Sequence, residues 1–596
     1  MGRVVAAGYA AFFALLLLPL PLRGRLPGNC DTWLNGLALP NALLLRLGAF
    51  VRGESAATSL YPETAIFGFG ESSFGTSTLF VMLKLLVADD ATAYYGLITV
   101  ILAGNAFGVY RLARHYVSDA ACAAFAGLAF AASNYVLGNI DSPHTSFFLV
   151  AFLCLDQCKL YLAHGRRRSL WLAALLGGLQ VWFSAYVFLF VSAAAAALLL
   201  SRRLRSAGTR RIERSAVVVA LLVYAVLAAP FFVFYERARS SENFSNPWDP
   251  VFLAEVHSME PADLLRTLEN NVLYPFDVPV LTEDINRLTR RMLQAGAVDE
   301  ASFLEPDNRV VMGRRALPED VKYFVYTRRC AFMGFALYGL ALYGLAATRR
   351  FRLELGGLYL AALLVALGPW VSVGDRLWPN VVYPLYAWLP LAGVLRVPSR
   401  AFAFAALALS LAAAVGLARL MARWRGATTR WSLLAAITLV VLAENVPIPL
   451  KSFEGRRLAT PEPLVLEFFA GRSGAVLLDL PSRPGGALFR DSADLYEWNR
   501  ELIYMNRQTY HRQHTLNGVH GYFPRTRLDA QRLIDRLPEP AALEALRSMG
   551  VEHLIYHRAL ELPWERGLYQ RLLGAPELVT AASSAEVTIF GWSRSP

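Results

Sequence analysis

Long apolar runs alternate with polar loops along the 596 residues of the chain. A helix needs about 20 apolar residues to cross a hydrocarbon core of roughly 30 Å, and about eleven runs come near that length. We divide the long run 169–201 around Trp182–Ala185. The predicted spans are residues 4–22, 92–113, 118–138, 144–163, 169–183, 184–201, 215–235, 328–347, 353–371, 399–421 and 431–447. The pattern predicts a polytopic α-helical membrane protein.

Arginines are concentrated in the loops on one side of this predicted bundle. Cytoplasmic loops carry an excess of Lys and Arg, so we expect these loops inside the cell and the N-terminus with them, in the inner (plasma) membrane. The run 4–22 lacks a small-x-small cleavage site and is predicted to remain as an anchor. The loops contain a single acid, Glu213, and lie at residues 111–114, 166–168, 202–214, 349–352 and 423–430.

Two other apolar stretches are predicted to lie along the outer interface of the membrane. Counting residues 73–89 as a span would place the arginine-rich loops outside, and residues 33–51 are amphipathic and interrupted. We therefore expect a transmembrane domain over residues 1–447, with outer loops at 23–91, 236–327 and 372–398.

The tail, residues 448–596, is predicted to be a small extracytoplasmic α/β domain. Ala475–Leu480 and Glu552–Tyr556 have the pattern of short buried strands, and Leu528–Leu537 and Pro540–Met549 that of helices.

The composition agrees with a membrane protein and argues against a nucleic-acid-binding function. The chain is 55% hydrophobic and 17% charged, with a mean hydropathy of +0.38, whereas soluble chains carry about 25% charged residues. The net charge of +12 gathers in short loops, so it indicates topology and not a nucleic-acid partner. The five cysteines show no disulfide framework.

Two acids are candidates for catalysis at the outer interface. Asp31 follows the first span, and Asp141 lies in the short turn before the fourth. Each can cap a helix, as aspartate often does. Two carboxylates at one level of the membrane are also how enzymes handle protons or hold a metal. His144, close behind Asp141, is a candidate substrate-binding residue.

Arg396 and Arg400 enter the tenth span from the outside, against the usual distribution of charge. A guanidinium group beside a helix N-terminus suits a phosphate. Contact with lipid headgroups explains the two arginines equally well. Glu71 and His257, in the outer loops, are weaker candidates for substrate binding.

Polar residues elsewhere in the chain give weaker indications of a site. His511, His514 and His520 in the tail lack the cysteines or clustered acids of ordinary metal sites, so no metal ligand is assigned. Asp156 lies inside the fourth span, where an acid is suspected of a function, although neighbouring Lys159 offers a neutralising partner.

An acid opening the first outer loop, followed by two amphipathic helices, resembles the GT-C superfamily of membrane glycosyltransferases. The resemblance implies that Asp31 holds the place of the family's catalytic acid and Asp141 that of a second acid. Asp31 lacks the adjacent acid common in protein O-mannosyltransferases, which leaves the acceptor class and the use of a divalent metal open. The segments Leu367–Pro369, Leu389–Arg400 and Tyr504–Gly518 are similar to a loosely characterised bacterial group of GT-C-like proteins.

The resemblance implies transfer of a sugar from a polyprenyl-phosphate donor to a glycan, lipid or protein acceptor on the outer face. Asp31 would be the general base, and Arg396 and Arg400 would bind the donor phosphate. The alternative is a non-enzymatic transporter or flippase, or an assembly factor, for lipid-linked envelope glycans. Transporters place polar groups near the bilayer midplane, whereas the informative residues here lie at the outer interface, which favours surface chemistry.

Overall fold

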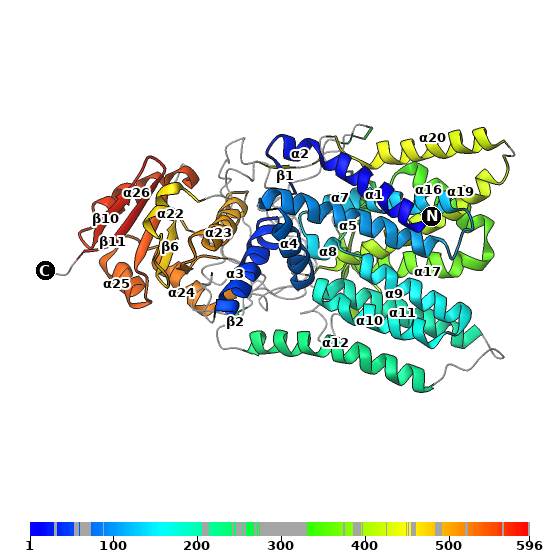
Figure 1. The fold of residues 1–596 in the computed structure, drawn as a ribbon, viewed down its shortest axis with the longest axis horizontal. Coiled ribbons are helices and arrows are strands. Elements are labelled where there is room, and N and C mark those ends of the chain that lie inside the picture. The colour runs from blue at the N-terminus through cyan, green and yellow to red at the C-terminus, as the bar shows by residue number, and fades with distance from the viewer. Residues whose placement is uncertain are drawn as a thin grey trace.

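A computed structural model shows a helical bundle joined at one end to a five-stranded sheet (Figure 1). The structure describes residues 1–28, 32–52, 59, 73–87, 89–205, 214–240, 244–245, 254, 258–267, 271, 273–274, 330–373, 376–384, 395, 397–424, 426–448, 450, 452–453, 461–482, 492–518, 523–562 and 565–593.

The bundle contains a helix at each of the eleven predicted spans. In chain order its helices are α1 Gly2–Leu17, α2 Pro19–Leu22, η1 Thr32–Ala38, α3 Leu39–Arg52, α4 Phe74–Leu86, α5 Asp90–Ala113, α6 Ala120–Ala131, α7 Asn134–Gly138, α8 Pro143–Ser146, α9 Leu149–His164, α10 Arg167–Phe183, α11 Ala185–Arg205, α12 Arg214–Ser240, η3 Pro261–Leu265, α16 Phe335–Ala347, α17 Arg349–Ala366, η6 Pro398–Ala401, α19 Phe402–Met421 and α20 Ala427–Asn445.

Eight helical stretches within the described residues are long and apolar enough to cross a membrane. They are Gly2–Leu22, Leu34–Arg52, Asp90–Ala113, Ala120–Gly138, Pro143–His164, Ser215–Arg237, Pro398–Met421 and Ala427–Asn445. Of the two segments predicted to be interfacial, Phe74–Leu86 is shorter, as are Ala185–Leu200 and Phe335–Ala347, whereas Leu34–Arg52 is one of the eight. The protein is therefore a polytopic helical membrane protein, and the count of eleven crossings stays a prediction.

The helix α19 forms the centre of the bundle. In its apolar window 94% of the residues are buried, against 17% for the peripheral helix α12. Small residues let α16 approach α19 closely, since a Cβ on Gly344 would lie 2.2 Å from the carbonyl oxygen of Ala412, and one on Gly416 would lie 2.1 Å from that of Leu340. Such contacts drive helix association in membranes, where burial of apolar surface does not.

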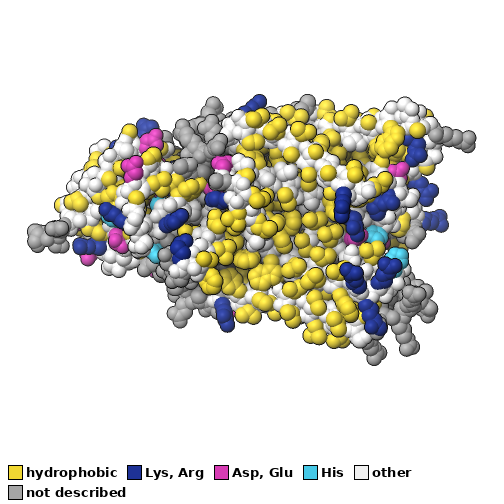
Figure 2. Space-filling model, viewed as in Figure 1, with side chains coloured by type: hydrophobic (Ala, Val, Ile, Leu, Met, Phe, Trp, Pro, Cys, Tyr) yellow, Lys and Arg dark blue, Asp and Glu magenta, His cyan; other side chains and the backbone are white. Residues whose placement is uncertain are grey.

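The long apolar run in the middle of the chain is broken where the sequence predicted. Ser184 has extended backbone between α10 and α11, and its amide still donates to the carbonyl of Gln180. Lys and Arg side chains gather at the end of the bundle remote from the C-terminal sheet, and the middle of the visible face is mainly hydrophobic (Figure 2). This is the distribution of a chain that crosses a bilayer.

The C-terminal region is a three-layer α/β structure. Its sheet has the order β10-β11-β9-β6-β7, with β6 parallel to β7 and β9, and β11 antiparallel to β9 and β10. The elements are α22 Pro463–Phe468, β6 Val476–Leu480, α23 Ser492–His511, β7 His514–Thr515, β8 Phe523–Pro524, α24 Arg525–Ile534, α25 Pro540–Ser548, β9 His553–His557, η7 Arg558–Leu560, α26 Arg566–Leu573, β10 Leu578–Ser583 and β11 Val587–Trp592. Both predicted strands and both predicted helices of the tail are confirmed.

Successive side chains of each strand point to opposite faces of the sheet, and different helices pack on the two faces. Leu478 and Leu554 point to the face packed by α24, α25 and α26, whereas Leu477 and Ile555 point to the face packed by α22. The helix α23 also covers this second face, as Tyr504 stacks on His557 with ring centroids 5.1 Å apart.

Short strands connect the tail to the loops of the bundle. β1 (Leu26–Pro27) pairs with β5 (Ser452–Phe453), and β2 (Phe244–Ser245) pairs with β8. A further hairpin, β3 (Trp370–Val373) with β4 (Arg376–Pro379), follows α17. The tail is thus joined to both the first and the second of the loops predicted to be on the outer side, and the division at residues 447 and 448 stays a prediction.

Candidate active site

Asp141 lies in a rigid turn between α7 and α8, with 1% of its surface exposed. The Ser142 amide donates to the carbonyl of Asn139 at 3.1 Å, and the Ser146 hydroxyl donates to the same oxygen at 2.5 Å. Asn105 of α5 donates from its side chain to the Ser146 carbonyl at 2.6 Å. Three hydrogen bonds therefore hold the turn that carries Asp141 at the end of the bundle nearest the tail.

The first outer loop passes directly against Asp141. Gly28 is buried with φ +99°, and a Cβ on it would lie 2.7 Å from the Cβ of Asp141 and 2.5 Å from the Oγ1 of Thr32. The Thr32 hydroxyl lies 3.2 Å from the Tyr94 hydroxyl, which donates to the carbonyl of Ile140, next to Asp141, at 3.2 Å. Gly28 thus contacts Asp141 directly, and Thr32 is linked to the turn of Asp141 through Tyr94.

Arg400 is held at the same end of the bundle by two tyrosines. Its guanidinium carbon lies 4.5 Å from the centre of the Tyr186 ring, an arrangement that favours a cation through the ring's negative face. The hydroxyl of Tyr135 lies 3.3 Å from the carbonyl oxygens of both Ser399 and Arg400. Since Asn139 donates to the Tyr135 carbonyl at 2.7 Å, the turns carrying Arg400 and Asp141 belong to one connected structure.

Four of the residues predicted to belong to the site lie outside the described residues. They are Asp31, Glu71, His257 and Arg396. His144 is described, and it is buried on α8, three residues after Asp141. The structure therefore brings together Asp141, His144 and the flanks of Asp31.

Asp156 has structural partners at the opposite end of the bundle. Its two carboxylate oxygens lie 2.8 Å from Arg111 Nη2 and 2.8 Å from His115 Nε2. Lys159, expected to neutralise it, forms an ion pair with Glu354 of α17. These contacts tie α5, α9 and α17 together and explain the intramembrane acid without a catalytic role.

No group of three or more His, Cys, Asp or Glu side chains that could hold a metal occurs in the part of the chain that the structure describes. His511 is buried, its Nδ1 accepts from the Gln513 amide at 3.2 Å, and burial lowers its pKa to about 4. A neutral, hydrogen-bonded histidine of this kind supports the local fold of the tail.

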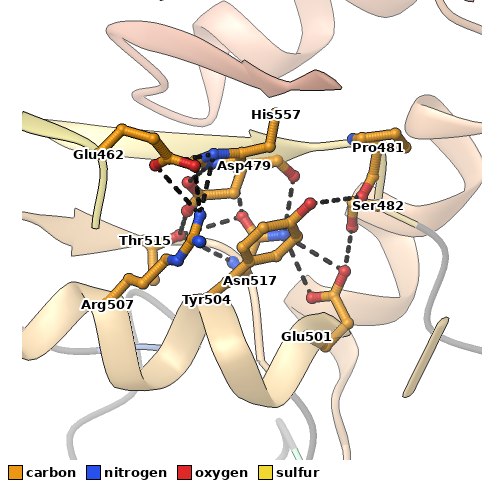
Figure 3. Close-up of polar contacts among 10 residues, drawn as sticks. All are labelled: Glu462, Asp479, Pro481, Ser482, Glu501, Tyr504, Arg507, Thr515, Asn517 and His557. Atoms are coloured by element: carbon orange, nitrogen blue, oxygen red, sulfur yellow. Dashed lines mark hydrogen bonds and ion pairs between the residues drawn. The ribbon is translucent and has the colours of Figure 1, made fainter. Parts of the chain in front are cut away.

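The tail contains a buried polar network that the sequence did not predict (Figure 3). His557 on β9 lies between two carboxylates, with its Nε2 2.8 Å from Asp479 and its Nδ1 3.4 Å from Glu462. Arg507 of α23 donates to Glu462 at 3.0 Å. The hydroxyl of Tyr504, also on α23, donates to the carbonyl of Pro481 at 3.0 Å.

The charges of this network fix the protonation of its members. Burial alone would raise the pKa of Glu462, but the hydrogen bond with His557 and the positive charges of His557 and Arg507 outweigh burial and lower it to about 2. Burial alone would lower the pKa of His557, but its bonds to Asp479 and Glu462 raise it above the ordinary value. The hydrogen bond from Arg507 to Glu462 and the bond from Tyr504 to Pro481 connect α23 to the rest of the tail.

Two residues next to the site, Pro27 and Gly28, could have been identified from the sequence as part of a turn. Pro27 and Gly28 form a dipeptide typical of a turn, and the structure uses the glycine where a side chain would strike Asp141. Tyr94 and Tyr186 carry no comparable signal, because aromatic residues near helix ends are common in membrane proteins.

Comparisons with known proteins give structural matches. No family model and no curated protein matches the chain. Solved structures similar to it include the arabinofuranosyltransferase AftD from Mycobacteria, at 16% identity and a TM-score of 0.52 over 100% of this chain and 42% of that one. The chain thus spans less than half the length of that protein.

Two further structures are similar at lower scores. The archaeal oligosaccharyltransferase AglB from Archaeoglobus fulgidus matches at 12% identity and a TM-score of 0.44, over 99% of this chain and 74% of that one. ArnT from Cupriavidus metallidurans, bound to undecaprenyl phosphate, matches at 13% identity and a TM-score of 0.39, over 99% and 97%.

Proposed function

From the GT-C fold of the chain, which the arabinofuranosyltransferase match confirms, we propose that the protein is a membrane glycosyltransferase. It moves a sugar from a polyprenyl-phosphate carrier to a hydroxyl of a glycan, lipid or protein on the outer face. One observation carries the proposal: the Cα and Cβ of buried Asp141 pack against Gly28, three residues before Asp31 in the sequence. Two acids at one point of the outer interface suit proton transfer.

The proposed reaction is a single displacement at the anomeric carbon. Asp31 accepts the proton of the acceptor hydroxyl while that oxygen forms a bond to the anomeric carbon. The bond from this carbon to the phosphate oxygen breaks, and its electron pair leaves with the polyprenyl phosphate. Asp141 orients Asp31 or the acceptor from its fixed turn.

The departing phosphate needs a positive charge that is already in place. Arg400 supplies it, because its guanidinium group is held against Tyr186 at the start of α19. Arg396 acts beside it on the same phosphate. Preorganised cations that meet charge developing in the transition state stabilise it without further reorganisation.

The test is Asp31→Asn in the full-length chain, in membranes supplied with polyprenyl-phosphate sugar. Transfer should be abolished while the amount and thermal stability of the protein stay unchanged. Asp529→Asn, a change at an exposed acid of the tail, is the control. Full activity of the Asp31→Asn variant would exclude the base assignment.

Glycan analysis of a strain that lacks the protein identifies the substrates. Loss of one sugar residue from one polymer would name both donor sugar and acceptor. An unchanged set of envelope glycans would contradict the proposed function.

A further inference from the structure

We propose that the C-terminal domain positions the first outer loop for the reaction, and that Tyr510 of α23 is a positioning residue for it. The inference rests on the proposed function, because that loop carries Asp31. Its basis is a set of contacts that join α23 to η1, α3 and α5. The helices α23 and α3 lie side by side between the sheet and the bundle (Figure 1).

Tyr510 reaches from the tail into a buried polar cluster of the loop. Its hydroxyl donates to Asp90 Oδ2 at 2.5 Å, at the first turn of α5. Asp90 also accepts from Asn41 of α3 at 3.0 Å and forms an ion pair with Lys84 of α4. Lys84 donates in turn to Asn41 at 2.6 Å. One hydroxyl of the tail therefore completes a cluster that joins three helices around the first outer loop.

The state of the tyrosine is fixed by its surroundings. Burial, and then the negative charge of Asp90, raise the pKa of Tyr510, so it remains protonated and donates the hydrogen bond. Hydrogen bonds to charged groups contribute about 1.5–3 kcal/mol, more than those between neutral groups. This bond is strong enough to hold a short loop segment in place.

Apolar packing links α23 to the segment that follows Asp31. Leu502, Ile503 and Met505 of α23 belong to the same core as Leu34 and Leu37 of η1. These residues of α23 are 0–2% exposed, although the helix lies outside the predicted membrane spans. The helix α23, which covers one face of the tail's sheet, thus also packs against η1.

The tail contacts the loop at two more points, one on the five-stranded sheet and one on β5. Ser59 forms a parallel bridge with Thr515 of β7, which extends the edge of the sheet by one residue of the loop. Arg25, just before β1, donates to the carbonyl of Ser452 at 2.8 Å. The loop is therefore attached to the tail both before and after positions 29–31.

The helix α23 can hold the first outer loop in position only if α23 is itself fixed to the rest of the tail. Arg500 of α23 forms two hydrogen bonds with Glu565, at 2.6 and 2.8 Å, and Arg507 binds Glu462. The helix is therefore fixed to the start of α26 and the start of α22 by paired charges, and to the loop by Tyr510. A displacement of about 1 Å at a catalytic group can cost about 100-fold in rate, so this support has a direct consequence for transfer.

The experiment compares Tyr510→Phe with Tyr556→Phe in the full-length chain in lipid nanodiscs. Tyr556 is a matched control, because its hydroxyl donates to a carboxylate at 2.9 Å within the tail, on Glu561. Hydrogen–deuterium exchange of peptides covering residues 32–52 should become at least about tenfold faster in Tyr510→Phe, as loss of about 1.4 kcal/mol implies, and stay unchanged in Tyr556→Phe. Equal exchange in the two variants would overturn the inference.

Two further readouts separate positioning from general instability and from failure of the proposed function. The rate of sugar transfer in Tyr510→Phe should fall about tenfold to 100-fold, while the Kd for undecaprenyl phosphate, used as the probe, stays within about twofold. Faster exchange with an unchanged transfer rate would overturn the catalytic part of the inference. A wild-type chain without transfer activity would refute the proposed function, while the exchange measurement still decides whether Tyr510 holds the loop.

Discussion

A Cβ built on Gly28 lies 2.7 Å from the Cβ of Asp141 and 2.9 Å from its Cα. Two segments more than a hundred residues apart in the sequence therefore lie so close that no side chain larger than the hydrogen atom of glycine fits at position 28. Gly28 also has φ +99°, a backbone conformation that other residues adopt at a cost. The contact packs the start of the first predicted outer loop against the turn of Asp141.

Gly28→Ala should separate these two segments. The added methyl group meets backbone and Cβ atoms that cannot rotate away, so the loop must shift and transfer should fall by about 100-fold or more. Gly24→Ala is the control, because Gly24 also has positive φ, +64°, but has open space around it. Both variants pay the backbone cost of about 1–2 kcal/mol. Equal transfer rates in the two variants would contradict the role of the contact.

Asp141→Asn and Asp156→Asn should have different effects. Asp141 belongs to the proposed site, so its amide variant should keep its stability and lose about 100-fold or more in transfer rate. Asp156 pairs with Arg111 and His115, so its variant should lose about 1–3 kcal/mol of stability and keep its rate per folded molecule. Thermal unfolding and transfer assays on the same preparations measure both quantities. A stable, active Asp141→Asn variant would remove this residue from the mechanism.

The helices of the bundle and part of the tail could be predicted because their apolar patterns are local. The strand β6 is apolar at every position except Asp479. The break between α10 and α11 is at Ser184, directly after the aromatic residues Trp182 and Phe183. The helix α23 could not be predicted, because Arg500, Glu501 and Arg507 suggest an exposed segment. Each of these charges is buried by a partner distant in sequence: Glu565, Arg527 and Glu462, respectively.

The sequence proposed candidate residues, and their assignment to a site stays a prediction. The predicted topology puts Asp31 and Asp141 at one level of the membrane, but no pattern in the sequence required Gly28 to touch Asp141. The role of Tyr510 depends on Asp90, 420 positions away. Contacts of this range follow from the packing of whole elements, which periodicity and charge counts do not determine.

The buried network of the tail predicts how stability depends on pH. The pKa of Glu462 is lowered from 4.5 to about 2, so its stabilisation is complete above pH 4.5 and is lost as the pH falls towards 2. The shift corresponds to roughly 3 kcal/mol. The pKa of His557 is raised above 6.5, so its contribution is complete below pH 6.5 and is lost as the pH rises through the folded-state value.

Thermal unfolding of the full-length chain should therefore give the highest Tm between pH 4.5 and 6.5 if this network dominates. Glu462→Gln should lower the Tm at pH 5 and weaken the further loss between pH 4.5 and 2. Glu539→Gln is the control, because Glu539 pairs with Arg536 at the surface. A Glu462→Gln variant with the acid sensitivity of the wild type would show that the network does not control stability.

Arg400→Ala should weaken binding of the donor more than it slows a saturated reaction. The guanidinium group is the charge proposed to meet the lipid phosphate, and hydrogen bonds to charged groups contribute about 1.5–3 kcal/mol, so the apparent KM for the donor should rise about tenfold to 100-fold. Ser399→Ala removes a neighbouring buried hydroxyl and should change KM by less than about twofold. Tyr186→Leu, which removes the ring 4.5 Å from Arg400, should give an intermediate increase, and Tyr186→Phe, which keeps the ring, a small one. Equal, small changes in all four variants would mean that Arg400 contacts lipid headgroups and not the donor.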